Sequence, residues 1–411
     1  MSQKPVGLRN NHARARPGMR RNVLVVDVNA IGMVAVIRSL GRAGYNIHAI
    51  ASQRDALGLY SRFTHHTDCN PPLDSASYLP WLREYIRSHG IEAIIQSEGF
   101  LHAIDSAYEE FAPLLPDSVP ASVWQRCLSK VATQQWLMDA SPASSRNMPA
   151  GGIMKDAESI PGKVDLAGLD GPFFVKADAG LARNAPAAQV IRCETVAQLS
   201  AAARGLLPGY EALVWQNFAP GKKVGVSLWR HNGKFMAQNM TLGIHMQPWT
   251  GGMMSLRESF WHEALLADAR NKLEVLEWQG VAMMEYKWDP VNDQFWFIEI
   301  NARYWGYLHL DLYAGKDFPK LQVDAFFGNL SEDMEPPAKK FACRHTVPGE
   351  IGYVMSRIRA SDIPVWPKVC SIGGFFFRFL NLRTKSDLWY PGDRLLYWRS
   401  WLNYLRKLVT H

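Results

Sequence analysis

Hydrophobic and polar positions divide this chain into short apolar runs and longer helical patterns. Apolar runs bounded by turn residues predict β-strands at 23–27, 46–50, 91–96, 172–177, 212–217, 224–229, 234–239, 281–288 and 297–303. Helical spacing at 33–41 and 78–89 separates the first three runs, which is typical of a β-α-β unit with a parallel sheet. This unit lacks the Gly-x-Gly-x-x-Gly fingerprint, so the pattern does not indicate a dinucleotide site.

The last predicted strand carries three polar side chains on one face. Glu299, Asn301 and Arg303 are two residues apart, and the side chains of a strand alternate between its faces. The apolar residues between them face the core. A carboxylate and an amide oxygen side by side are suitable ligands for Mg²⁺. A neighbouring guanidinium suits a phosphate or a carboxylate.

The preceding strand brings a second acid to the same place. Residues 289–293, Asp-Pro-Val-Asn-Asp, have strong turn chemistry. A hairpin that turns about Asn292 puts Glu285 opposite Glu299, with the two Cβ atoms about 5 Å apart. Two carboxylates that close repel each other unless a cation lies between them, and two bridged Mg²⁺ ions are common in phosphoryl transfer. The alternative is a solvated amphipathic hairpin with acids placed by chance.

These motifs resemble a known family. A strand acid followed by Glu-x-Asn-x-Arg and a nearby glycine is similar to the metal and phosphate site of the ATP-grasp superfamily. The ending Asn-Ala-Arg-Tyr-Trp-Gly, at 301–306, most resembles the branch with the carbamoyl-phosphate synthase large chain and the carboxylate–amine ligases. The resemblance extends over residues 22–330. It implies an α/β fold with α+β grasp lobes: a Rossmann-like pre-grasp domain at 22–120, an N-lobe at 121–210 and a C-lobe at 211–335.

The resemblance also implies a way to hold a nucleotide. Lys130 and Lys176 match the two lysines that contact the nucleotide phosphates in the family. The segment 212–221 matches the linker strand that holds adenine; its candidate contacts are Gln216, Asn217 and Phe218.

Two segments depart from the family pattern. Relatives carry an acid after the adenine linker that binds the ribose hydroxyls, whereas Lys222 and Lys223 stand here, which leaves the identity of the nucleotide open. The loop 178–184 is glycine-rich in many relatives but has a single glycine here, and its Arg183 is a candidate phosphate contact.

Three weaker candidates complete the expected site. The segment 243–252 resembles a loop that lies over the acyl-phosphate site, and His245 stands where relatives often carry arginine, although a lone histidine is commonly a structural hydrogen-bonding group. Arg257 is a second candidate anion ligand. Glu98 follows a predicted parallel strand and is either a ligand contact or a helix cap.

Composition and charge indicate how many domains the chain has room for and which cellular compartment it favours. A chain of 411 residues with 47% hydrophobic residues has room for two or three globular domains. Five widely spaced cysteines without a Cys-x-x-Cys motif argue against a disulfide framework or a zinc site and favour the cytoplasm. Residues 1–21 contain six basic residues and no acid, against a net charge of +7 for the whole chain, so we expect a disordered basic tail. Contact of this tail with an anionic surface is the alternative to a solvated tail, and no nucleic-acid partner is expected.

The chain ends in a segment, 336–411, that the resemblance does not cover. Between 393 and 409, apolar residues recur at helical spacing: Leu395, Trp398, Trp401, Leu402, Leu405 and Val409. Basic residues occupy the other positions, which is the composition of an interfacial helix. The helix either docks on the protein's own core or attaches the protein to the inner face of a membrane.

Together the resemblance and the residues predict an ATP-dependent carboxylate–amine ligase. A substrate carboxylate would attack the γ-phosphate of ATP, and an amine would then attack the acyl phosphate to give an amide, ADP and phosphate. Glu285, Glu299 and Asn301 would hold Mg²⁺, or Mn²⁺, and Arg303 would stabilise the developing charge. The alternatives are an ATP-grasp small-molecule kinase and a non-catalytic ATP-binding regulatory protein.

Overall fold

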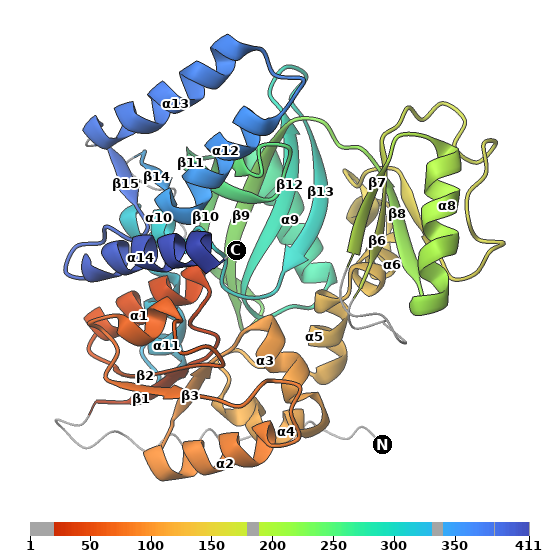
Figure 1. The fold of residues 1–411 in the computed structure, drawn as a ribbon. Helices are drawn as coiled ribbons and strands as arrows, with labels where there is room; N and C mark the ends of the chain where they lie inside the picture. The colour runs from red at the N-terminus through yellow and green to blue at the C-terminus, as the bar shows by residue number, and fades with distance from the viewer. Residues whose placement is uncertain (1–19, 179–188, 331–339, 382, 411) are drawn as a thin grey trace, which may run out of the picture.

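The computed structural model describes residues 20–178, 189–330, 340–381 and 383–410. Within these ranges the chain forms three β-sheets surrounded by helices (Figure 1). Most of the expected basic tail, the candidate Arg183 and residues 331–339 lie outside the described residues. Of the tail, Arg21 is described, and its guanidinium forms an ion pair with Glu92 at 2.5 Å.

The first sheet is parallel, with strand order β3-β2-β1-β4, and it confirms the predicted β-α-β pattern. Its elements are β1 (Asn22–Val25), α1 (Ile31–Arg42), β2 (Asn46–Ala51), β3 (His66–Cys69), α2 (Tyr78–His89), β4 (Ala93–Ile95) and α3 (Glu98–Ala103). The apolar residues of β1 are buried because helices cover both faces of such a sheet. Helix α2 ends at Gly90, whose left-handed φ of 57° is favoured by glycine.

Short helices lead to a second, antiparallel sheet with strand order β5-β8-β6-β7. These elements are α4 (Tyr108–Phe111), α5 (Ala121–Leu128), α6 (Lys130–Ala140), α7 (Pro142–Ser145), β5 (Gly151–Met154), β6 (Phe173–Ala177), β7 (Gln189–Cys193), α8 (Val196–Leu206) and β8 (Leu213–Asn217). Strand β8 pairs with N-lobe strands, although the prediction assigned residues 211–335 to the C-lobe.

The third sheet has seven strands in the order β13-β12-β9-β10-β11-β14-β15. Its elements are β9 (Lys222–His231), β10 (Lys234–Gln247), β11 (Met253–Phe260), α9 (Glu263–Val275), β12 (Gly280–Asp289), β13 (Gln294–Asn301), α10 (Leu308–Tyr313), α11 (Phe318–Phe326), β14 (Ala342–Arg344) and β15 (Thr384–Ser386). Strands β14 and β15 extend this sheet, so the C-terminal segment 336–411 contributes two strands to it.

The C-terminal part of the chain forms three helices: α12 (Ile351–Arg359), α13 (Val365–Leu380) and α14 (Leu395–Thr410). Helices α13 and α14 lie on the side of the molecule away from the second sheet (Figure 1). No helix of the described residues combines the length and the apolar character that crossing a membrane requires.

The cores explain how the sheets are held. One large core joins residues of the parallel sheet to residues of the seven-stranded sheet, so these two parts are packed as one body. The second sheet has a separate small core around Phe173, Val175 and Leu199. A lobe with its own core can move relative to the rest without exposing the main core. All five cysteines are free, as their spacing predicted.

Candidate active site

Glu285 of β12 and Glu299 of β13 are direct partners in the antiparallel register, as the sequence predicted. The turn between the strands occupies residues 290–293, where the Oδ1 atom of Asp289 accepts a hydrogen bond from the N–H of Val291 at 2.9 Å. Asp293 takes a left-handed φ of 55°, which asparagine and aspartate tolerate better than most residues. The turn pairs Asp289 with Gln294, and this register alone would put Glu285 opposite Ile298. A β-bulge between Glu285 and Tyr286 shifts the pairing by one residue and brings the two acids together.

Two lysines approach the paired acids. The Nζ atom of Lys223 lies 2.8 Å from Oε2 of Glu285, and the Nζ atom of Lys130 lies 3.5 Å from Oε2 of Glu299. Burial raises the pKa of Glu285, and Lys223 only partly offsets this effect. Burial also acts to raise the pKa of Glu299, but the nearby lysines outweigh it, so that pKa lies below its usual value. Of the two acids, Glu299 therefore ionises more readily than Glu285.

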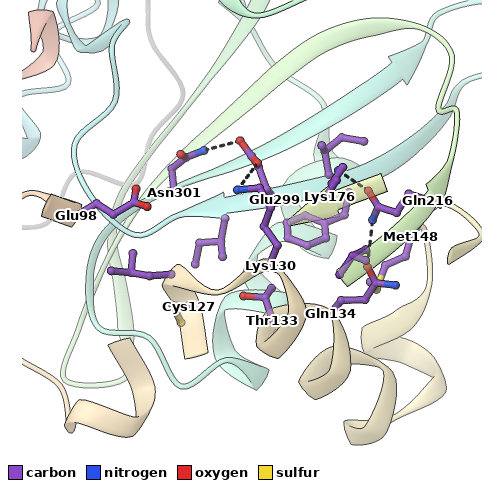
Figure 2. A pocket seen from close by; sticks show the side chains of 15 residues that line it. Glu98, Cys127, Lys130, Thr133, Gln134, Met148, Lys176, Gln216, Glu299 and Asn301 are labelled. Carbon is purple, nitrogen blue, oxygen red and sulfur yellow. Dashed lines mark hydrogen bonds and ion pairs between the residues drawn. The ribbon is translucent and has the colours of Figure 1, made fainter. Parts of the chain in front are cut away.

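A row of polar groups continues from Glu299 toward the parallel sheet (Figure 2). The Nδ2 atom of Asn301 donates to Oε1 of Glu299 at 3.5 Å, and Arg303 donates to Oδ1 of Asn301 at 3.1 Å. The Nε atom of Arg303 lies 3.4 Å from Oε2 of Glu98. Glu98 is the first residue of α3, whose N-cap is Ser97. Ser97, and not Glu98, is therefore the helix cap. Glu98 lines the pocket, which is the position that a ligand contact requires.

The second sheet contributes Lys176 to the same pocket, where it lies beside Gln216 (Figure 2). Its Nζ atom donates to Oε1 of Gln216 at 2.5 Å, and Gln216 donates in turn to Gln134 at 3.4 Å. Burial lowers the pKa of Lys176, because the charged form loses its hydration there. Lys130, Lys176 and Gln216 thus line the same pocket as Glu299 and Asn301, which is what the sequence predicted.

A buried aspartate connects the two segments that carry Lys130 and Lys176. Asp178 directly follows β6, which carries Lys176, and its Oδ2 atom accepts hydrogen bonds from Ser129 Oγ at 2.8 Å and from the N–H of Val131 at 3.1 Å. Ser129 also caps α6 by accepting from the N–H of Ala132 at 3.1 Å. The carboxylate at the helix N-terminus is favoured by the helix dipole. Strand β6 and the helix that begins with Lys130 are thereby joined.

Two backbone donors of the segment expected to hold adenine are used within the protein. The N–H of Asn217 donates to the carbonyl of Ala150 at 2.7 Å, and the N–H of Phe218 donates to the carbonyl of Pro172 at 2.9 Å. Phe218 remains 42% exposed, and Oδ1 of Asn217 is buried without a protein partner among the described residues. A ligand here would meet the exposed ring of Phe218 and the side chain of Asn217, since those two N–H groups are already engaged.

The structure corrects the interpretation of His245. This residue belongs to β10, and its Nδ1 atom lies 3.1 Å from Oε1 of Glu350. Its ring stacks on Tyr353 with 3.9 Å between the ring centroids. His245 therefore docks α12 onto the sheet and does not line the pocket. The other end of the same segment does reach the site, because the carbonyl of Gly252 accepts a hydrogen bond from Lys223 at 3.0 Å.

Arg257 also has a structural role. Its side chain is fully buried in β11, and its guanidinium pairs with the equally buried carboxylate of Asp387, beside Cys343. A buried guanidinium that already has a carboxylate partner is not available to a substrate anion. The expectation that Arg257 binds a substrate anion was wrong, since Asp387 is 130 residues away in sequence and no local pattern indicated it.

Two contributors to the site were not recognised as such from the sequence. Lys223 stood out only as a departure from the family, and its contact with Glu285 depends on the pairing of β9 with β12. The sequence predicts only that Asp178 begins the loop 178–184. A signal was present in the pattern Lys176-Ala177-Asp178, because an acid two residues after a strand lysine lies on the same face in extended chain.

No protein-family model and no curated protein sequence matches the chain. Solved structures, in contrast, match this chain over most of its length. An L-amino acid ligase from Bacillus licheniformis aligns with a TM-score of 0.55 and 14% identity, over 76% of this chain and 75% of that one. N5-carboxyaminoimidazole synthetase from Staphylococcus aureus, complexed with ADP, aligns with a TM-score of 0.59 and 14% identity, over 79% and 82%.

The biotin carboxylase domain of a 2-oxoglutarate carboxylase from Hydrogenobacter thermophilus, in complex with MgADP, ADP and bicarbonate, is a third similar structure. It aligns with a TM-score of 0.60 and 18% identity, over 77% of this chain and 72% of that one. All three are ATP-grasp enzymes of the carboxylate–amine ligase branch. This chain therefore shares the overall fold of these three structures.

Proposed function

We propose that the chain is an ATP-dependent carboxylate–amine ligase that forms an amide through an acyl phosphate and releases ADP and phosphate. The observation that supports this most is the direct pairing of Glu285 with Glu299, followed on the same strand face by Asn301 and then Arg303. We place the reaction in the pocket between the second and third sheets.

The donor set is suitable for Mg²⁺. Among the described residues there is no group of three or more histidine, cysteine or acidic side chains that could hold a metal. Protein sites for Mg²⁺ commonly use one or two carboxylates and leave the other positions to water and substrate phosphates. Glu285, Glu299 and the amide oxygen of Asn301 provide such a set. Mg²⁺ held there would neutralise the phosphate oxygens and align them for transfer.

The chain's own cations then have separate tasks. Lys176 and Lys130 face the pocket from the N-lobe side and would bind the α- and β-phosphates. Arg303 lies beside Asn301, where it would stabilise the charge that develops as the substrate carboxylate attacks the γ-phosphate. The amine next attacks the acyl carbon, and the phosphate leaves with the former carboxylate oxygen. Glu98 would orient Arg303 during both steps.

Entry of a nucleotide requires the lobes to part. The pocket as described holds a free volume of about 40 Å³. Pockets for small ligands are typically about 300–1,000 Å³. Because the second sheet has its own core, we infer that it moves as a unit when the nucleotide binds. Opening would break the contact between Lys130 and Glu299 and release both groups for the ligand.

The test is isotope transfer. Carboxylic acids labelled with ¹⁸O are incubated with ATP, Mg²⁺ and a panel of amines, and the released phosphate is analysed by mass spectrometry. A ligase transfers one ¹⁸O from the acid to phosphate, and only when acid and amine are both present is turnover sustained. ADP formation with an alcohol would indicate a kinase, and firm nucleotide binding without turnover would indicate a regulatory protein. Either result would reject the ligase.

A further inference from the structure

Helix α13 exposes an unusually apolar surface. Eight large hydrophobic side chains of this helix are at least 38% exposed: Val365, Trp366, Val369, Ile372, Phe376, Phe377, Phe379 and Leu380. The helix has no buried residue and carries no acid. Most of these side chains follow helical spacing and so form one stripe. A stripe of this size on a chain surface marks an interaction site.

Helix α14 adds a second stripe. Leu395, Trp398, Leu402 and Leu405 recur at intervals of three and four residues and are 46–78% exposed. The opposite side of the helix docks on the body, where Leu396 is fully buried in a small core with Val34. Four of the six apolar residues of the predicted face are thus exposed, whereas Trp401 is only partly exposed and the side chain of Val409 is outside the described part of the structure.

A hollow of about 530 Å³ lies between the end of α13 and the start of α14. Phe379, Trp389 and Trp398, which are exposed apolar residues, line it. Its lining also includes Arg344, Arg378, Lys385 and Arg394, and no acidic residue. The two apolar stripes thus meet at a cavity with four basic side chains.

Arg344 is the innermost of these cations. The residue is 5% exposed, its guanidinium packs 4.0 Å from the centre of the Phe379 ring, and it donates to the carbonyl of Phe375 at 3.3 Å. Within the described residues it has no carboxylate inside ion-pair distance. Burial lowers its pKa and Arg378 adds to this effect, while Glu350, which lies beyond ion-pair distance, offsets part of it. A buried cation without a close counter-ion is well suited to an external anion.

The charge around the stripes is strongly positive. Residues 351–411 contain ten lysines and arginines and three aspartates. Two of those aspartates, Asp387 and Asp393, are fully engaged inside the protein by Arg257 and Arg38. A surface with Trp, Phe and Leu on its apolar side and Lys and Arg around it is the composition of segments that lie in the headgroup region of anionic bilayers.

We propose that α13, α14 and the hollow between them, together the C-terminal face, dock onto a bilayer that contains anionic phospholipid. The hollow receives a lipid phosphate, and the two apolar stripes enter the headgroup region. The C-terminal face lies away from the second sheet, so the N-lobe stays free to open while the protein is bound (Figure 1). This inference does not depend on the ligase reaction.

Vesicle flotation of the full-length chain tests the proposal. We expect the protein to float with vesicles of phosphatidylcholine and phosphatidylglycerol, at least about tenfold more than with phosphatidylcholine alone, and to dissociate at high salt. Phe376→Ser with Phe377→Ser should abolish flotation. Arg378→Gln with Arg394→Gln should remove the preference for anionic vesicles while leaving circular dichroism unchanged.

Matched controls distinguish binding through this surface from nonspecific adsorption to vesicles. Val164→Ser with Val291→Ser removes two exposed apolar side chains elsewhere, and Arg192→Gln with Arg204→Gln removes two exposed cations of the N-lobe. Both controls should float like the unchanged protein. Equal flotation with neutral and anionic vesicles, or none at all, overturns the proposal. So does a lipid-free dimer that Phe376→Ser with Phe377→Ser converts to a monomer, because the stripes would then serve a second copy of the chain.

Discussion

The ammonium group of Lys223 lies 2.8 Å from a carboxylate oxygen of Glu285, one of the two acids assigned to the metal. Lysine and Mg²⁺ would compete for this carboxylate, and the lysine is largely buried, with 17% of its side chain exposed. The family usually has an acid in this part of the chain. In the proposed site, the lysine would therefore change the charge near the metal as well as the contact with ribose.

Replacing Lys223 by glutamine should strengthen Mg²⁺ binding. Without the competing ammonium, the Mg²⁺ concentration at half-maximal nucleotide binding should fall about tenfold, which corresponds to about 1.4 kcal/mol. A Mg²⁺ titration of nucleotide affinity by calorimetry measures this. The neighbouring Lys222→Gln is the control, because Lys222 is exposed and should leave the titration unchanged. Unchanged or weaker Mg²⁺ binding in Lys223→Gln would show that the lysine does not compete with the ion.

Nucleotide affinity should fall at alkaline pH because of Lys176. Burial lowers the pKa of this lysine below the ordinary value of 10.5, so it loses its proton earlier than a surface lysine. Only the protonated form attracts phosphate, and affinity is therefore full below the lowered pKa and declines as pH rises through it. Arginine stays charged above pH 12, so Lys176→Arg should flatten the alkaline decline.

Fluorescence titration of the nucleotide across the alkaline range measures this effect. The exposed Lys163→Arg serves as the control and should keep the profile of the unchanged protein. An identical decline in Lys176→Arg would assign the titration to another group.

Arg303 should affect turnover more than binding. Its guanidinium is held by Asn301 and Glu98, where charge would develop in the proposed transfer. Arg303→Lys loses the planar fork, and we expect kcat to fall about 10²–10³-fold with nucleotide Kd nearly constant. The exposed Arg204→Lys is the control. Loss of nucleotide binding with unchanged kcat would instead make Arg303 a ground-state ligand.

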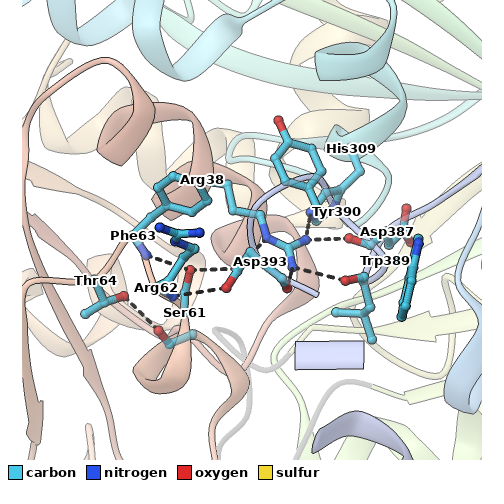
Figure 3. A network of polar contacts seen from close by, with 12 residues as sticks. Arg38, Ser61, Arg62, Phe63, Thr64, His309, Asp387, Trp389, Tyr390 and Asp393 are labelled. Atoms are coloured by element: carbon cyan, nitrogen blue, oxygen red, sulfur yellow. Dashed lines mark hydrogen bonds and ion pairs between the residues drawn. The ribbon is translucent and has the colours of Figure 1, made fainter. Parts of the chain in front are cut away.

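Asp393→Asn should destabilise the whole protein. Asp393 forms a buried ion pair with Arg38 of α1 at 2.8 Å and also accepts from Ser61 at 2.8 Å (Figure 3). Removing one charge leaves Arg38 buried without its counter-ion, which costs about 3–5 kcal/mol. The midpoint of urea unfolding measures the change. Asp362→Asn, at an exposed position, should leave it unchanged, and an equally stable Asp393→Asn protein would mean that the ion pair is dispensable.

The part of the site that could be predicted from the sequence is local. Glu285 and Glu299 lie on one hairpin, so their approach could be predicted, although their direct pairing also depends on a β-bulge beside Glu285 that the sequence did not indicate. Lys130 and Lys176 were identified by their order in the family pattern, and both line the pocket. The parallel strands were visible because buried strands are continuously apolar.

The part that could not be predicted depends on distant partners. Arg257 and His245 have the chemistry of anion ligands, but Asp387 and Glu350, far along the chain, occupy them. The apolar stripe of α14 was clear in the sequence, yet only packing of Leu396 on the body determines that the stripe faces outward. Periodicity defines the faces of a helix, whereas tertiary contacts decide which face is buried.

The most direct test of the metal site is calorimetry of a non-hydrolysable ATP analogue with Mg²⁺ and with EDTA. If Glu285 and Glu299 hold the ion, Mg²⁺ should raise the affinity of the unchanged protein at least about tenfold, and Glu299→Gln should remove that gain. Glu274→Gln, which changes an exposed acid of α9, should retain it. Equal affinity with Mg²⁺ and EDTA in the unchanged protein, or a full gain in Glu299→Gln, would contradict the account.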